Sequence, residues 1–424
     1  MLDEKLYALI QKYGIDTVGV DRPYVFPKAM CWNRLKAVVG FLRVAKLLND
    51  ALDNVPDDCI ALCGENRKLL EAVWWLLLPR NREKIRFLVT AVRQENKFHG
   101  RAVLEIYEAE GHQVSAALVA ALHPGWKANL LGRQFDGPII DLYSLICENH
   151  LEHLFSGYLK HDPYADIFIA RHYCRQAQDL KQRQIWHQRL IAHYLRARDF
   201  LGVEKEIRAY GEAGYEDAGN YSAFLHELRM LLSDIKVQLS TRKERDVFVY
   251  WLDQLEKEDF LSMRWAGKLW TGRFFHHAYT TMMHTTMVFR SIFTGKSVKE
   301  GGLAKYGKLD EGNAELLHRA ARENQIVRIF SCASNGHFRP SFVHACCKNL
   351  TPHAPATIGF WYALDTVLSS TEPCICFLHC METHNPFNST ESDIWQFDSW
   401  AKKIFFHKSE NGLCKKRGRK PGAS

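Results

Sequence analysis

Apolar positions along the chain follow two patterns, one typical of amphipathic helices and one typical of buried strands. Near the N-terminus Leu6, Leu9 and Ile10 recur at helical spacing, and a second amphipathic stretch runs over residues 32–52. We therefore expect residues 1–52 to form an N-terminal helical segment that packs on the part of the chain that follows it.

Between residues 53 and 145 short apolar runs alternate with helical patterns. The runs at residues 59–63 and 85–89 flank a helical pattern over residues 67–78, which together predict one βαβ unit. Two later apolar runs can supply further strands, at residues 117–121 and 138–142. This alternation predicts a small Rossmann-like α/β domain over residues 53–145.

The turn Gly64-Glu65-Asn66 lies between the first predicted strand and its helix. Its functional interpretation is a phosphate-binding turn, because backbone N–H groups and the dipole at a helix N-terminus favour an anion. However, the G-x-G-x-x-G fingerprint is missing, and the Glu65 carboxylate would repel a phosphate. We therefore interpret the turn as a structural βα connection.

Residues 146–242 show apolar and aromatic positions at three- and four-residue spacing, with short breaks near Asp199 and at residues 211–214. This pattern predicts a helical connector made of a few packed hairpins. The units are too few for a repeat-type binding surface, which needs about three stacked repeats.

From residue 246 the α/β pattern returns, within a last domain that we bound at residues 243–410. The predicted strands are residues 247–252, 274–279, 326–332 and 374–379, and the predicted helices are residues 285–293 and 314–323. Residues 411–424 are rich in Gly, Lys and Arg and are predicted to be a disordered basic tail.

Composition mainly excludes classes of protein. With 47% apolar and 25% charged residues the chain is an ordinary globular sequence, and no run of eighteen apolar residues predicts a membrane span. Twelve scattered cysteines indicate reduced thiols and a cytoplasmic protein. Five of the +8 net charges come from residues 415–420, which leaves about +3 elsewhere, so we do not expect a nucleic-acid-binding face.

Three residues of the last domain carry candidate chemistry. Asp253 follows a predicted strand, at the end where open parallel sheets bind ligands. Its carboxylate is interpreted either as a metal ligand or as a cap for the next turn. Thr285 begins a predicted helix, where the dipole favours a developing alkoxide, although an ordinary N-cap is the alternative. His384 follows the predicted strand at residues 374–379. Its imidazole is interpreted either as a group that contacts the substrate or as a solvated loop side chain.

Together these motifs resemble the sulfatase-like branch of the alkaline phosphatase superfamily. They occur in the family's order: the strand ending in Asp253, the block from Ala278-Tyr279-Thr280-Thr281 to Arg290-Ser291-Ile292-Phe293-Thr294-Gly295-Lys296, and the turn Glu382-Thr383-His384-Asn385-Pro386-Phe387. The resemblance covers residues 246–390 and implies an alkaline-phosphatase-like α/β/α domain.

The resemblance also implies roles for these residues. Asp253 would bind a catalytic divalent metal ion (Ca, Mn, Mg or Zn). Thr285, nine residues before Thr294-Gly295, would be the nucleophile, with Thr286 as the alternative, and His384 would contact the departing group. The implied substrate is a sulfate or phosphate ester, including carbohydrate-linked esters of cell-surface polysaccharides. Because threonine replaces the sulfatase cysteine, phosphoester or phosphoglycol transfer is expected at least as much as sulfate cleavage.

The chain departs from the family at one motif. Nothing after His384 matches the Asp-His-Gly that completes the family's metal site, so the domain is interpreted as incomplete. One interpretation is that the chain is a truncated and inactive member of the family. The alternative is a non-catalytic binding or scaffold protein. The missing motif would also supply a strand and its helix, so we expect an exposed apolar face or unpaired edge and self-association, unless the helices of residues 146–242 cover it.

Overall fold

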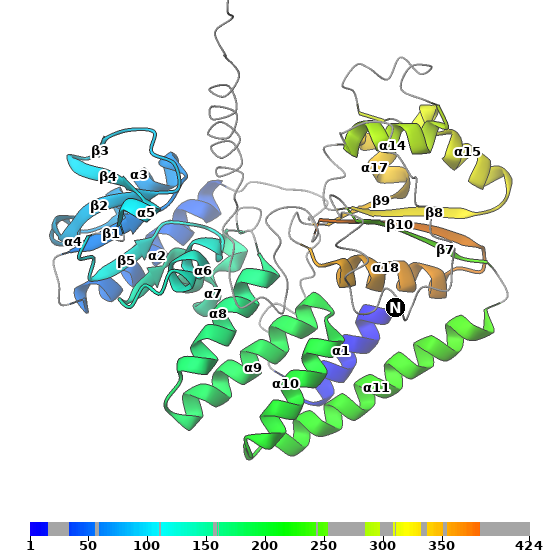
Figure 1. Ribbon diagram of the computed structural model, residues 1–424, viewed down its shortest axis with the longest axis horizontal. Coiled ribbons are helices and arrows are strands. Elements are labelled where there is room, and N and C mark those ends of the chain that lie inside the picture. The colour runs from blue at the N-terminus through cyan, green and yellow to red at the C-terminus, as the bar shows by residue number, and fades with distance from the viewer. Residues whose placement is uncertain are drawn as a thin grey trace, which may run out of the picture. The chain divides into compact units, whose positions relative to one another are not determined.

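A computed structural model describes residues 1–15, 34–55, 59–109, 112–155, 159, 161–242, 245–252, 285–296, 308–309, 311–331, 337–350 and 354–381. These residues form two compact units, one of residues 34–169 and one of residues 1–15 with 170–381. Each unit contains a sheet dominated by parallel strands with helices packed on it (Figure 1). The chain is therefore of the mixed α/β class, as the sequence pattern predicts.

The unit of residues 34–169 is built on a six-stranded sheet in the order β3-β4-β2-β1-β5-β6. All neighbouring strands are parallel except for the β3–β4 hairpin. The strands are β1 (Ile60–Cys63), β2 (Ile85–Thr90), β3 (Lys97–Phe98), β4 (Arg101–Glu105), β5 (Ala116–Val119) and β6 (Ile139–Asp141). Every residue of β1 and β5 is buried, which explains why both read as continuous apolar runs.

Helices cover both faces of this sheet. Residues of α2, α3 and α7 share a core with Leu62 and Leu88, whereas α5 and α6 place Ile106 and Trp126 in a second core on the other face. The helices are α2 (Arg34–Asp53), α3 (Arg67–Leu76), α4 (Pro79–Lys84), α5 (Ile106–Ala109), α6 (Gly125–Gly132), α7 (Leu142–Glu148) and the short η1 (Glu152–Leu154). The boundary between the units falls within α8 (Pro163–Gln176).

The second unit contains a four-stranded, fully parallel sheet in the order β7-β10-β8-β9. The strands are β7 (Val247–Leu252), β8 (Ile326–Ser331), β9 (Cys347–Asn349) and β10 (Cys374–Cys380). One face is covered by α18 (Ala356–Ser369), and the other by α14 (Thr285–Thr294), α15 (Glu315–Arg322) and α17 (Pro340–Cys346), with η2 (Glu311–Asn313) before α15 (Figure 1).

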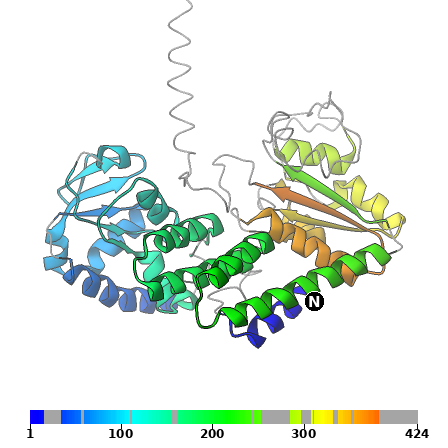
Figure 2. The ribbon, with the colours of Figure 1, turned by 60° about the horizontal axis from the view of Figure 1, so that its bottom comes forward.

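The N-terminal helix α1 (Leu2–Lys12) belongs to this second unit and lies beside α11 (Figure 2). Its Asp3 carboxylate accepts hydrogen bonds from Trp361 Nε1 of α18 and from Arg198 Nη2, both at 2.8 Å. Arg198 ends α9 in the left-handed conformation, with φ of 56°. The helices of this region are α9 (Leu180–Ala197), α10 (Phe200–Glu212) and α11 (Ala218–Thr241). Helix α1 is thus anchored by polar contacts far apart in the sequence.

Most predicted elements of the last domain are confirmed: the strands at 247–252, 326–332 and 374–379 and the helices at 285–293 and 314–323 each appear within one or two residues of the expected bounds. The strand predicted at 274–279 and the basic tail lie outside the described residues. Both faces of the sheet carry helices, and β7 is an edge strand. Among the helices of the described residues, none is long and apolar enough to cross a membrane.

Candidate functional site

Helix α14 runs antiparallel to the strand beneath it. Its last turn contacts the middle of β10, because the rings of Phe293 and Phe377 lie 5.1 Å apart. One turn earlier, the ring of Phe289 lies 4.5 Å from Trp251 and 5.2 Å from His379. Trp251 and His379 are partners in the β7–β10 register, each one residue before the end of its strand. Moving back along the helix therefore means moving toward the carboxyl ends of the strands.

This direction places Thr285 at the carboxyl edge of the sheet. Thr285 is the first residue of α14, four residues before Phe289, and four residues of helix rise by about 6 Å. The same distance corresponds to about two residues of strand. The N-terminus of α14 is therefore level with the point where the chain leaves β7 and β10. Thr285 is half-buried, and the first turn of the helix contains no acidic residue.

A buried serine–histidine pair lies at the same edge. Ser331, the last residue of β8, and His379 of β10 are adjacent across the sheet, with 2.9 Å between Ser331 Oγ and His379 Nδ1. Both residues are buried, and the ring of His337 lies 5.9 Å from that of His379 and 5.4 Å from Phe289. These polar groups lie among aromatic rings, so their hydrogen bonds carry more weight than at an exposed surface.

No motif in the sequence assigns a role to Ser331, His337 or His379. The available signal was a polar residue near the end of an otherwise apolar strand, which is where parallel sheets place functional groups. Because the strand order was not predictable, the sequence did not show that β8 and β10 are neighbours.

Two of the three predicted site residues, Asp253 and His384, lie outside the described residues. In the sequence Asp253 directly follows β7, and His384 follows β10 by four residues. The structure pairs these two strands in parallel, with Leu252 opposite Cys380 at their ends. It therefore brings together the strand ends that precede both residues and the helix that begins with Thr285.

Metal ligands are not gathered in the part of the chain that the structure describes: no group of three or more His, Cys, Asp and Glu side chains there could hold a metal ion. The thiols of Cys374, Cys376 and Cys380 are buried in β10. Burial raises the pKa of the Cys376 thiol to about 12, which disfavours the thiolate that a zinc site needs. The described residues thus supply a hydroxyl and imidazoles but not a metal cluster of their own.

The chain matches no known protein-family profile, no curated protein and no solved structure. Any assignment of function therefore depends on the motifs and on the geometry of this edge.

Proposed function

We propose that the chain is a hydrolase or transferase of sulfate or phosphate esters, related to the sulfatase-like branch of the alkaline phosphatase superfamily, with Thr285 as its nucleophile. The observation that carries this proposal is the direction of α14. Because the helix runs antiparallel to β10, its first residue is a threonine at the carboxyl edge of a parallel sheet, which is the edge that binds ligands in open α/β folds.

In this proposal the residues of the chain act in two steps. The deprotonated Thr285 Oγ attacks phosphorus or sulfur, and the bond from that atom to the ester oxygen breaks while His384 donates a proton to the departing oxygen. Water or an acceptor hydroxyl then gives its proton to His384 and attacks the phosphorus or sulfur of the covalent Thr285 ester, and the bond to Thr285 Oγ breaks to restore the alkoxide. The dipole and backbone N–H groups at the start of α14 stabilise the negative charge on Thr285 Oγ.

A divalent ion bound through Asp253 would neutralise charge on the non-bridging oxygens of the ester. Since the described residues contain no cluster that could add three further ligands, the rest of its shell would consist of water or of residues elsewhere in the chain. The proposed metal affinity is therefore modest.

We also infer that the unit of residues 34–169 is Rossmann-like. Its five parallel strands, numbered in chain order, lie in the sequence 3-2-1-4-5 across the sheet, which is the order found in doubly wound nucleotide-binding domains. The strand order reverses between β1 and β5. The proposed catalytic chemistry does not depend on this unit.

The decisive experiment compares two threonine variants of one helix. Wild-type protein, Thr285→Ala and Thr294→Ala are assayed with aryl phosphate, phosphodiester and sulfate substrates in Mn²⁺, Zn²⁺ or Ca²⁺. Removal of a nucleophile should lower kcat about a thousandfold or more. Thr294 is the matched control, because its hydroxyl lies at the other end of α14, where it donates to the Arg290 carbonyl, at 2.6 Å, and accepts from the Lys296 N–H, at 3.3 Å. Thr294→Ala should keep most of the activity.

Intact-mass analysis after rapid quenching should show a phosphoryl or sulfuryl adduct in the wild type and none in Thr285→Ala. Equal turnover by wild type and Thr285→Ala would remove the proposed role, and loss only in Thr286→Ala would move it by one residue. No turnover of any ester, together with no stoichiometric divalent binding in calorimetry, would favour the scaffold alternative.

A further inference from the structure

A pocket of about 200 Å³ lies in the other unit, at the carboxyl edge of its sheet. Its walls come from the turn after β1, the first turns of α3, the end of β2 and the loop that follows β2. Its floor is apolar, formed by Leu70, Leu88 and Val103. The pocket is therefore lined by elements that meet at one edge of the sheet.

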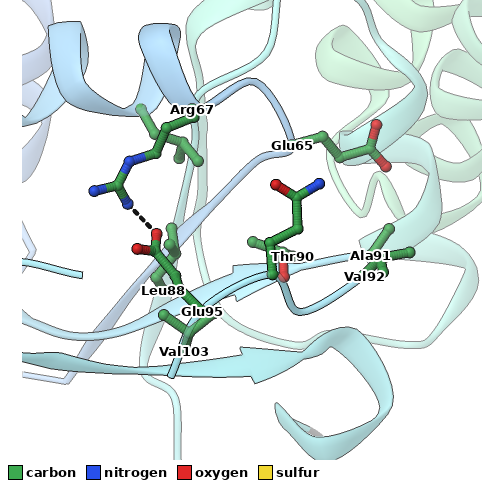
Figure 3. A pocket seen from close by; sticks show the side chains of 10 residues that line it. Glu65, Arg67, Leu88, Thr90, Ala91, Val92, Glu95 and Val103 are labelled. Carbon is green, nitrogen blue, oxygen red and sulfur yellow. Dashed lines mark hydrogen bonds and ion pairs between the residues drawn. The ribbon is translucent and has the colours of Figure 1, made fainter. Parts of the chain in front are cut away.

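Thr90 supplies a hydroxyl without a partner to this pocket. It is the last residue of β2 and only 9% exposed, yet its Oγ1 is buried and makes no hydrogen bond among the described residues. Side chains alternate along a strand, so Thr90 faces the same side as Leu88, which is the side of the pocket. Figure 3 shows Thr90 between Glu65 on one side and the Arg67–Glu95 pair on the other.

An unpaired buried hydroxyl is destabilising, so its presence in a closely packed sheet needs an explanation. A ligand group that hydrogen-bonds to it is one such explanation.

The charges around the pocket disfavour an anionic ligand. Arg67 is the one cation among the residues that line the pocket, and it is engaged by Glu95 and by Glu71, with 2.9 Å between Arg67 Nη2 and Glu71 Oε1. Its guanidinium also lies 4.4 Å from the centre of the Phe98 ring. Two carboxylates, Glu65 and Glu95, line the rim. Phosphate would therefore meet net negative charge, even though the pocket lies near a helix N-terminus.

The polar groups instead match a ligand that both donates and accepts hydrogen bonds. Carboxylates only accept, Arg67 only donates, and Thr90 Oγ1 and the Gln94 amide do both. Hydroxyl groups satisfy all of these partners, whereas a cation could not accept from Arg67 or Gln94. The volume is below the range of about 300–1,000 Å³ typical of drug-sized ligands, so it fits a single ring.

We propose that this pocket binds a neutral ring with neighbouring hydroxyl groups, such as a pentose or hexose unit, with Thr90 Oγ1 hydrogen-bonded to one hydroxyl and the apolar floor against the ring face. The ring can belong to a nucleoside or to a free sugar, since both present the same chemistry. This site is separate from the ester-cleaving edge and does not rest on that proposal.

Calorimetry on the full-length chain tests the proposal with four probes: adenosine, methyl α-D-glucopyranoside, AMP and inorganic phosphate. We expect adenosine or the glucoside to bind and AMP to bind no more tightly than adenosine. Thr90→Val keeps the shape of the side chain but removes the hydroxyl, and it should weaken binding about tenfold. Its melting temperature should be unchanged or higher, because no protein hydrogen bond is lost.

Thr241→Val, exposed at the end of α11, is the matched control and should bind like the wild type. Gln94→Ala is a second pocket variant that removes an amide from the rim and should also weaken binding. Binding of adenosine identifies a nucleoside as the source of the ring, and binding of the glucoside alone identifies a free sugar. Tighter binding of AMP or phosphate, no binding of any probe, or full affinity in both pocket variants would overturn the proposal.

Discussion

Helices α3 and α14 occupy equivalent places in their units but begin with different chemistry. Each starts at the carboxyl edge of a parallel sheet. In α3 the first turn is satisfied internally, because the Asn66 side chain accepts from the Leu69 N–H at 3.2 Å, and Arg67 is paired with glutamates. Helix α14 begins with Thr285, and neither helix has an acid in its first turn. The same architecture therefore presents a pocket proposed for a neutral ligand at one edge and a candidate nucleophile at the other.

The two helices also pack differently. Leu70 and Val73 of α3 meet aliphatic side chains of the sheet, such as Leu62, and Trp74 packs edge-on against the single ring of Phe98. In contrast, Phe289 and Phe293 of α14 pack among aromatic rings of β7, β10 and α17. Large rings contribute more buried area per residue, so a few side chains fix the position of Thr285. We therefore expect the position of α14 to depend on single aromatic side chains more strongly than the position of α3 depends on single aliphatic ones.

Phe289→Ala should have the largest effect. Phe289 is 1% exposed and lies beside Trp251, Phe338 and His379, so truncation should cost about 3–5 kcal/mol of unfolding free energy and loosen the start of α14. Denaturant unfolding and hydrogen exchange of α14 measure both effects. Phe360→Ala is the matched control, because this ring is 38% exposed in the same unit, and it should cost less than about 1 kcal/mol. Equal costs would show that α14 is not positioned by the buried ring.

Two glycines sharpen the comparison of the sheets. A Cβ at Gly64 would lie 2.9 Å from the Ala120 carbonyl oxygen, which is backbone and cannot turn away, so Gly64→Ala should destabilise the 34–169 unit by about 1–3 kcal/mol. A Cβ at Gly359 in α18 would make only ordinary contacts, the nearest at 3.7 Å to Leu350 and Leu378. Since alanine favours a helix interior, Gly359→Ala should be neutral or stabilise by up to about 1 kcal/mol. Thermal melts of the two variants should shift in opposite directions or differ clearly in size.

The sequence predicts β1 and the start of α3 well because each has a physical signature of its own. A fully buried strand reads as a continuous apolar run, and the start of α3 follows a capping asparagine. Strand β4, which lies between β3 and β2, and helix α18 were not predicted. Helix α18 is apolar around most of its circumference, since both the sheet and the N-terminal helix contact it, so no amphipathic period marks it.

The candidate sites divide in the same way. The position of Thr285 at the start of a helix could be predicted, because the helical pattern follows an apolar strand that ends before an acid. The Ser331–His379 pair could not, because β8 and β10 are 43 residues or more apart and only the sheet order makes them neighbours. Thr90 carried no signal either. Whether its hydroxyl has a partner depends on packing around a strand end, which a single sequence does not encode in any local pattern.

A pH-dependent contrast separates the helices α9 and α10 from the sheet of the other unit. His187 of α9 is mostly buried, with a side chain that is 14% exposed. It contacts Cys174, and its Nδ1 pairs with the Glu206 carboxylate of α10. Hydrogen bonding to Cys174 and to the Glu206 carboxylate raises the His187 pKa from 6.5 to about 9. A group whose pKa is raised on folding stabilises the protein fully below the unfolded value and loses that contribution as pH rises through the folded value. The difference in unfolding free energy between wild type and His187→Gln should therefore shrink from pH 6.5 to 9, by up to about 2 kcal/mol. In hydrogen exchange this difference should appear in α9 and α10 and be absent from β1 and β5 of the other unit, and a pH-independent difference would show that His187 is neutral in the folded chain.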